Sequence, residues 1–480
     1  YTATPFANVL QDRNKTPKSS WLINYNRNGQ ATKKEFSQEN NIFPDDFIIL
    51  LKPPTNYVGA KEIFETMEPI NNESGEKLPL VVPVKDSVDF FPSRVIQHSD
   101  GTISGIESVS NKAEFERSPL FTEFVSYEEY RQSTRASKRD DNFPTALPNS
   151  LKESVACFIL TIAVREARKP RMIYSRGYNP HHTMLIHTSR FIPWQNRTKD
   201  LIHSYIAELS SGLLNDIQTE PDSVYQYFKT IWYKYYAEIV ESISSYLPKG
   251  YVDPYMTPLT FDSITPRLES AATDIAVKAL NSFTKDKVQY NNANPQKVIA
   301  IGGNRLSRGF TLEGLTVNYF VRSAGCADTL LQMGRWFGYR PGYLDCCKIF
   351  TTTDLINRFN STTITVEELE GEFRKMEADS RSPNDFTLRV RKHPGALKIT
   401  RPSILKNTTE VKWSYQDHLV QATSFSINRD DIKSAWNSFK NNVIKPYKFY
   451  QKNDFWVTKT NGEGGMDIVR NIADLDEDKK

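Results

Sequence analysis

The chain has 480 residues and a formal net charge of +4, with 39% hydrophobic and 25% charged residues. These proportions are ordinary for a globular protein, and the length favours two or three domains over a single core. The small net charge excludes an arginine-rich tail protein. A local groove for nucleic acid stays compatible with it, because the charge of a sub-surface sets the local potential.

Cysteine usage and hydropathy indicate a protein of the reducing cytoplasm. The four cysteines form no Cys-x-x-Cys pair, which argues against a disulfide framework and a structural zinc site. The longest apolar run, at 155–164, is too short to cross a membrane, and no signal peptide is evident. We therefore expect a cytoplasmic location and no metal site in this chain.

The first residue is Tyr1 rather than Met, and we expect the chain to be a piece of a longer protein. Residues 1–58 contain one predicted strand, Phe47–Leu51, which Pro53 would stop. Regular patterning is lost from 59 to 148, which indicates an insertion or linker. The organisation becomes clear only after this segment.

Hydrophobic periodicity returns near residue 150. Apolar residues at helical spacing predict a helix from about 151 to 169, and His182–His187 predicts a buried strand. A second helix is expected at about 196–214. Aromatic residues at helical spacing fill 223–246, where a role in the core is favoured over base stacking.

The segment 297–360 predicts a doubly wound α/β domain. Its expected strands and helices alternate, at 298–301, 315–321, 328–337, 346–350 and 354–359. This alternation is typical of a parallel sheet with helices on both faces. Ligands of such sheets bind beyond the carboxyl ends of the strands, where the Gly302-Gly303-Asn304 turn is expected.

Two motifs in this segment could bind phosphate. The loop Gly302–Gly314 has four glycines within thirteen residues, together with Arg308 and a second arginine, so that its backbone could approach a phosphate closely. The alternative is a merely tight connection between strands. Later, Gln332, Gly334, Arg335 and Arg340 lie around the end of a predicted helix. Such arginines can stabilise a transferring phosphoryl group, or they can pair with structural carboxylates.

Together with the opening Thr2-Ala3-Thr4, these motifs resemble the later motifs of superfamily-two helicases. Two segments specifically resemble the Z-one domain. They are Gly-Asn-Arg-Leu-Ser-Arg-Gly-Phe-Thr-Leu-Glu-Gly and Gln-Met-Gly-Arg-Trp-Phe-Gly-Tyr-Arg. That domain is helicase-associated and occurs in bacterial proteins usually described as endonucleases. The resemblance covers about 146–430 and the first ten residues.

The resemblance implies a domain organisation and a set of functional residues. Residues 1–58 would end a first RecA-like lobe, 149–360 would form the second lobe, and 361–480 would be an α+β accessory region. ATP and Mg²⁺ would bind between the lobes of the parent protein, which would move along DNA in a restriction or defence setting. The implied site residues are Arg340 as arginine finger, Arg335 and Gln332 beside it, Gly302, Gly303, Asn304, Arg308 and Gly309 in the nucleotide loop, and Thr2 and Thr4 in interlobe coupling.

Two departures from the helicase pattern are visible. The two arginines stand five residues apart rather than three, which leaves the choice between Arg335 and Arg340 open. No Gly-Lys pair occurs in the chain, although a phosphate loop needs that lysine. We therefore expect the principal nucleotide ligands in an upstream lobe, no tightly bound cofactor here, and no ATPase activity of this chain alone.

A basic stretch at 381–406 carries seven Lys or Arg against one acid, which makes it a candidate for contact with the DNA backbone. Its candidate residues are Arg389, Arg391, Lys392, Lys398 and Arg401. Two alternatives to a motor stay open. One is a non-catalytic module that binds DNA or protein, and the other is a Mg²⁺-dependent nuclease that would use Asp385, Glu410 and Lys412.

Overall fold

The computed structural model describes residues 20–27, 30–37, 47–51, 53–109, 111–281, 288–303, 311–322, 327–383, 429–441, 449–452, 455–459 and 466–469. Contacts along the chain divide it into two compact units, 1–408 and 409–480. The first unit holds the large sheet and the candidate functional site.

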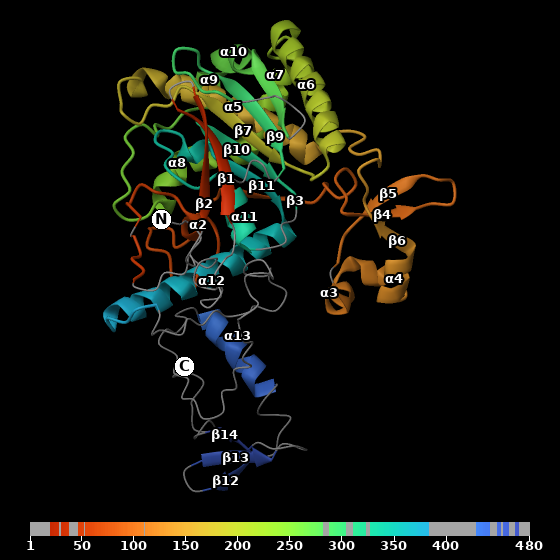
Figure 1. Cartoon of the computed structure of the whole chain (residues 1–480), viewed down its shortest axis with the longest axis vertical. Coiled ribbons are helices and arrows are strands. Elements are labelled where there is room, and N and C mark those ends of the chain that lie inside the picture. Colours follow the sequence, from red (N-terminus) through yellow and green to blue (C-terminus); the bar gives the residue numbers. More distant parts are fainter. Residues whose placement is uncertain are drawn as a thin grey trace. The chain divides into compact units, whose positions relative to one another are not determined.

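The centre of the first unit is a six-stranded sheet (Figure 1). Its strands are β3 (Val81–Val84), β7 (His182–His187), β8 (Ile275–Leu280), β9 (Lys297–Gly302), β10 (Leu315–Phe320) and β11 (Lys348–Thr352). The spatial order is β3-β11-β10-β7-β9-β8, and every neighbouring pair is parallel. The α/β prediction is thereby confirmed, and the carboxyl ends of all six strands meet at one edge of the sheet.

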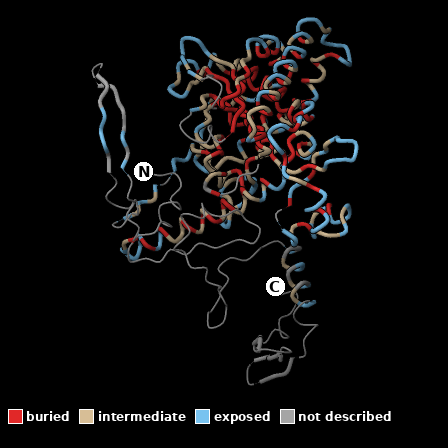
Figure 2. The backbone as a smooth tube through the Cα atoms, turned by 45° about the vertical axis from the view of Figure 1, so that its right-hand side comes forward, coloured by how far each residue is buried: buried red, intermediate tan, exposed pale blue. Residues whose placement is uncertain are grey.

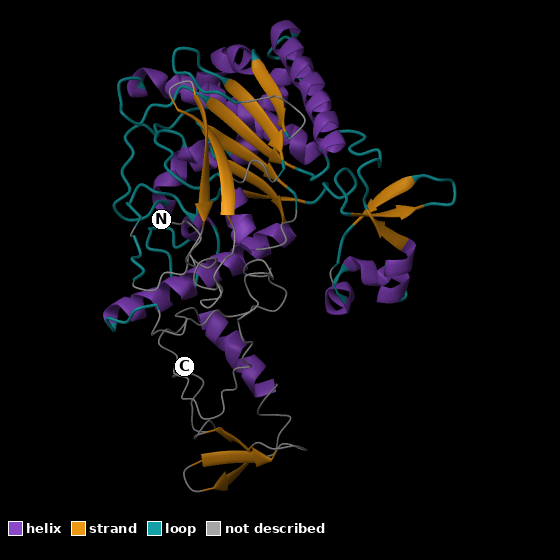
Figure 3. Cartoon of the chain, in the orientation of Figure 1, coloured by secondary structure: helices purple, strands orange, loops and turns teal. Residues whose placement is uncertain are grey.

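Helices cover both faces of this sheet (Figure 3). One face packs on α5 (Asn149–Met172), α6 (Ile192–Asn215), α7 (Val224–Tyr235), α8 (Ala237–Tyr246), α9 (Phe261–Ile264), η2 (Thr265–Arg267) and α10 (Leu268–Ala272), and the other on α11 (Ala327–Met333) and α12 (Thr353–Ala378). Side chains alternate between the faces, so that Met184 and Ile186 join the α5 side while Leu185 faces away from it. The buried residues therefore concentrate around the sheet, as Figure 2 shows.

Smaller elements surround this core. The segment 85–147 builds an antiparallel sheet of β4 (Arg94–Gln97), β5 (Ile103–Ile106) and β6 (Thr134–Ala136) beside α3 (Lys112–Arg117), η1 (Pro119–Thr122) and α4 (Tyr127–Ser133). Phe115 and Tyr130 lie in a separate apolar cluster there. The first unit also contains the hairpin β1 (Ser20–Arg27) and β2 (Gln30–Ser37), the short helix α2 (Ala60–Ile63) and η4 (Leu344–Cys346).

The second unit is described by α13 (Arg429–Phe439) and a three-stranded antiparallel sheet. The strands of that sheet are β12 (Phe449–Lys452), β13 (Phe455–Lys459) and β14 (Met466–Val469), in that order. None of these elements contains a residue that the sequence analysis placed in a catalytic or nucleotide-binding role.

Most of the predicted elements of the large sheet are confirmed. The strand at His182–His187 has the predicted bounds, and β9, β10 and α5 match within a few residues. The predicted strand at Phe47–Leu51 is wrong: these residues have no regular structure, and Phe47, Ile49 and Leu51 are exposed. The short helix expected at 354–359 is the first part of a longer helix, α12.

One edge strand comes from an unexpected place. β3 lies within 59–148 and pairs with β11. Asp86, which follows β3, accepts hydrogen bonds from the backbone and the hydroxyl of Ser150 at 2.9 and 2.5 Å. Because Pro148 at the start of α5 has no side-chain donor or acceptor, Asp86 supplies the cap of this helix. The cap fixes α5 against the end of the edge strand.

The far end of α5 carries a buried ion pair. Arg168 donates two hydrogen bonds to Asp345, at 2.7 and 2.6 Å, and both side chains are fully buried. Arg168 also donates to the carbonyls of Thr257 and Gly342. The paired carboxylate raises the pKa of Arg168 despite its burial. This single guanidinium therefore joins α5, the loop before α9 and the loop before β11.

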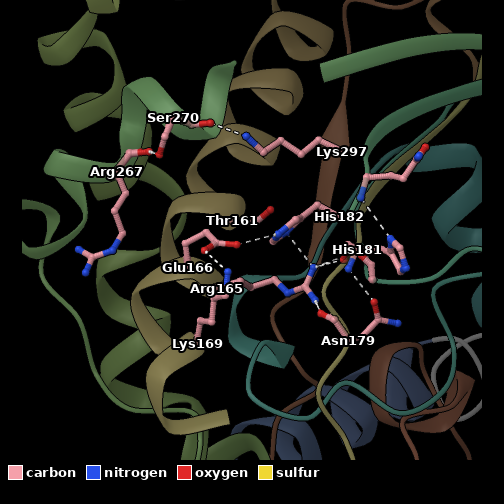
Figure 4. Close-up of polar contacts among 12 residues, drawn as sticks. Thr161, Arg165, Glu166, Lys169, Asn179, His181, His182, Arg267, Ser270 and Lys297 are labelled. Carbon is pink, nitrogen blue, oxygen red and sulfur yellow. Dashed lines mark hydrogen bonds and ion pairs between the residues drawn. The ribbon is translucent and has the colours of Figure 1, made fainter. Parts of the chain in front are cut away.

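A second buried arginine lies one turn earlier on α5. Arg165 donates to the carbonyls of Asn179 and His181, both at 2.6 Å, and to Nδ1 of His182 at 2.9 Å (Figure 4). Its guanidinium lies 4.4 Å from the ring centre of Tyr343. Arg165 thus closes the amino edge of the sheet, and both arginines are bonded in the interior of the domain.

We expect Arg168→Met to lower the free energy of unfolding by about 3–5 kcal/mol, because it leaves Asp345 charged and unpaired in the core. Urea unfolding followed by circular dichroism measures the loss. The double variant Arg168→Met/Asp345→Leu should recover part of it, and Lys169→Ala, on the exposed side of the same turn, should cost below about 0.5 kcal/mol. A loss below about 1 kcal/mol for Arg168→Met would contradict this role.

Candidate functional site

The carboxyl edge of the sheet places a histidine between two strand ends. His187, the last residue of β7, is fully buried, and its Nδ1 lies 2.8 Å from the carbonyl oxygen of Gly302 at the end of β9. A carbonyl only accepts, so Nδ1 carries the proton. Burial, with the nearby charges of Arg322 and Arg335, lowers the pKa of His187 to about 4, so the ring is neutral at pH 7.

Two arginines, Arg322 and Arg335, lie near this histidine, and Arg190 lies near Arg322. Arg322 follows β10 by two residues, Arg190 follows β7, and Arg335 follows α11. Burial lowers the pKa of Arg322, and the positive charge of Arg190 lowers it further. Within the described ranges, neither Arg190 nor Arg322 has an ion-pair partner. Positive charge therefore gathers where β7 and β10 end.

The glycine pair lies where the sequence predicted it. Gly302 ends β9 and Gly303 begins the following turn, and both are buried. A side chain on Gly303 would have its Cβ 3.2 Å from Nη1 of Arg322 and 3.2 Å from Nε2 of Gln195. Glycine at this position thus leaves the backbone open toward two nitrogen donors from other elements.

Arg335 and Arg340 have different surroundings. Arg340 donates to the carbonyls of Arg335, Trp336, Phe337 and Tyr339 at 2.7–3.4 Å, so that its guanidinium holds its own turn. The same turn exchanges two backbone hydrogen bonds with Val58, through Gly338 at 3.1 and 2.8 Å. Arg335 instead lies close enough to His187 to affect its pKa. The half-buried Gln332 lies on α11, before both arginines.

Several predicted site residues lie outside the described residues. They are Thr2 and Thr4, Asn304, Arg308 and Gly309, the DNA candidates Arg389, Arg391, Lys392, Lys398 and Arg401, and the nuclease candidates Asp385, Glu410 and Lys412. Of the predicted site residues, the structure brings Gly302, Gly303 and Arg335 to one edge and places Arg340 in the turn that follows Arg335.

Sequence reasoning missed Arg322, Arg190 and His187 as members of this edge. Each directly follows or ends a predicted strand, which is the only sequence signal they carry. The part of the chain with described positions contains no cluster of three His, Cys, Asp or Glu that could hold a metal ion. Among the same residues, every helix is too short or too polar to span a bilayer.

These features define an α/β protein with a parallel sheet and an arginine-lined carboxyl edge. The Z1 domain family matches residues 150–397, slightly more than half of the chain, and includes every strand of the large sheet except β3. The chain belongs to the Z1 domain family. No curated protein and no solved structure matches it.

Stability should fall as the pH drops below 6.5. The folded-state pKa is about 4 for His187 and about 3 for His182, where burial and then the charge of Arg165 lower it. An unfolded histidine titrates near 6.5, so the unfolded state takes up protons first. From pH 7 to pH 5 each histidine should lower the free energy of unfolding by about 2 kcal/mol.

Urea unfolding at both pH values tests this expectation. His187→Asn is the informative variant, because its amide can still donate to the Gly302 carbonyl but does not titrate. It should remove about half of the pH dependence. An undiminished dependence in this variant would show that His187 does not contribute.

Proposed function

We propose that this Z1 chain supplies the second lobe of an ATP-dependent motor that acts on DNA, within a protein that also has endonuclease activity in restriction or defence. The observation that carries the proposal is the convergence of Gly302, Gly303 and Arg335 on the carboxyl edge of a parallel sheet. Ligands bind at that edge in folds of this kind, and arginines stabilise phosphoryl transfer there.

The residues on this edge fit the phosphate end of a nucleotide. Arg335 lies near His187, whose ring stays neutral at pH 7. The adjacent turn begins with two glycines, which permit close approach of the backbone. Mg²⁺ ligands and a phosphate-loop lysine are absent from the edge as described, and in this proposal both come from the partner lobe.

The geometry favours Arg335 over Arg340 as the finger. Nη1 and Nη2 of Arg340 donate to four carbonyls of its own turn, while its Nε is buried without a partner among the described residues. Moving it to a phosphate would leave those carbonyls without their donor, which costs free energy for each buried one. We therefore assign to Arg340 the task of holding the turn that presents Arg335.

Paired substitutions in the protein with both lobes test the assignment. Arg335→Ala should lower DNA-stimulated ATP hydrolysis about 10³-fold, within the range of arginine-finger effects. Arg340→Ala should lower the melting temperature by several degrees, because the turn loses its internal donor. The reverse pattern, with Arg335→Ala within threefold of wild type, would return the finger to Arg340.

The proposal of DNA as partner is tested by salt dependence. Changing Arg389, Arg391, Lys392, Lys398 and Arg401 to Gln should weaken duplex binding and reduce the slope of log K against log salt by up to about 4. Fluorescence anisotropy measures both quantities. A control in which the exposed Lys112, Arg131 and Arg139 become Gln should keep the wild-type slope. Equal slopes for both variants would exclude the basic stretch as the DNA contact.

A further inference from the structure

Arg322 is costly for the fold in its present surroundings. Its Nη1 is buried and has no hydrogen-bond partner in the described part of the chain, and no carboxylate there pairs with it. The nearest charge that affects it is the like charge of Arg190. An unpaired guanidinium that is mostly removed from water destabilises the protein unless a ligand compensates it.

Other buried polar groups around Arg322 also lack partners. Oε1 of Gln195, the hydroxyl of Thr188 and Nε2 of His187 are all buried without a hydrogen-bond partner among the described residues. These side chains are each less than 5% exposed. Buried polar atoms normally find partners. Of these three, only the Thr188 hydroxyl can donate to an anion, because Oε1 of Gln195 and the unprotonated Nε2 of His187 are acceptors. Binding of an anion therefore depends on the nitrogen donors of Arg322 and Gln195.

The donors converge on Gly303 from two directions. Nη1 of Arg322 comes from the end of β10, and Nε2 of Gln195 comes from the first turn of α6, each 3.2 Å from the position of an added Cβ. Gln195 uses one amide proton on the carbonyl of Ser189, at 3.0 Å, which leaves the other free. α6 is 24 residues long and has no side-chain cap at its start, so its free N–H groups and dipole add positive potential.

We propose that Arg322, Gln195 and the backbone at Gly303 form an oxyanion cradle that binds one phosphate group. A phosphate suits the cradle because its oxygens can accept from donors that approach from different elements. The proposal deepens the proposed function, since it names a group that the carboxyl edge holds besides the contact of Arg335. The phosphate can belong to a nucleotide or to a nucleic-acid backbone, and binding experiments separate the two.

The first experiment removes the charge while it keeps the volume. In the full chain, Arg322→Met should weaken binding of tripolyphosphate at least tenfold by isothermal titration, while the melting temperature of the free protein stays the same or rises. Arg374→Met, on the exposed side of α12, should change neither quantity. A fall in melting temperature with unchanged phosphate binding would overturn the proposal, because it would show a purely structural role.

The second variant fills the cradle. Gly303→Ala should also weaken tripolyphosphate binding at least tenfold, since its methyl group would lie between the two donors. ATP without metal and a twelve-residue oligodeoxynucleotide then serve as separate ligands. Weakening for ATP alone assigns the cradle to the nucleotide, and weakening for the oligonucleotide alone assigns it to the backbone. If neither ligand is affected by either variant, or if the wild-type chain binds no phosphate, the cradle does not exist.

The two proposals fail in different ways. Loss of ATP hydrolysis in Arg335→Ala with unchanged phosphate binding in Arg322→Met would retain the motor and reject the cradle. Phosphate binding that depends on Arg322, in a protein whose hydrolysis does not depend on Arg335, would retain the cradle and reject the finger. Each outcome is therefore assigned to one proposal.

Discussion

The buried pair of Arg168 and Asp345 is the interaction on which the organisation of this domain depends. Taking both charges out of water costs free energy, and the pair is tolerable because two parallel hydrogen bonds and two further carbonyls satisfy the guanidinium. Arg165, one turn away on α5, is also buried and donates to two backbone carbonyls. Together the two residues anchor the end of α5 to the loop that enters β11, and that loop follows directly after the turn of Arg335 and Arg340. The position of the candidate finger is thus set from the interior of the protein.

Each edge of the sheet has a buried or mostly buried arginine, and the two arginines differ in their surroundings. At the amino edge, both Nη1 and Nη2 of Arg165 donate to backbone carbonyl oxygens. At the carboxyl edge, Arg322 is mostly buried and lacks such acceptors in the described residues. Burial alone therefore does not distinguish a structural arginine from a ligand-binding one. The distinction lies in whether the surrounding backbone supplies acceptors, which only the folded structure reveals.

Sequence patterns predicted the centre of the sheet better than its margins. β7, β9 and β10 are rich in apolar residues and buried along almost their whole length, as expected for parallel strands that are covered on both faces. β8 (IAVKAL) mixes good helix formers with β-branched residues, and β3 (VVPV) is short and contains a proline that is tolerated because the strand is at the edge. Gly302 and Gly303 were identifiable because a glycine pair at the end of a strand indicates a turn whose backbone can approach a ligand closely. Arg322 was not, since one arginine outside a recognisable motif carries no local signal.

The pairing of β3 has a consequence for how the chain is made. β3 is an edge strand, and β11 is its neighbour in the large sheet; the contact from Lys348 to Pro79 spans 269 residues. At ordinary rates of synthesis roughly 15–50 s separate the appearance of the two strands on the ribosome. During that interval β3 lacks both its ladder partner and α12, which follows β11 in the chain. Its proline and its length of four residues limit its pairing with a strand of another chain. The short edge strand is therefore protected from intermolecular pairing until β11 has been made.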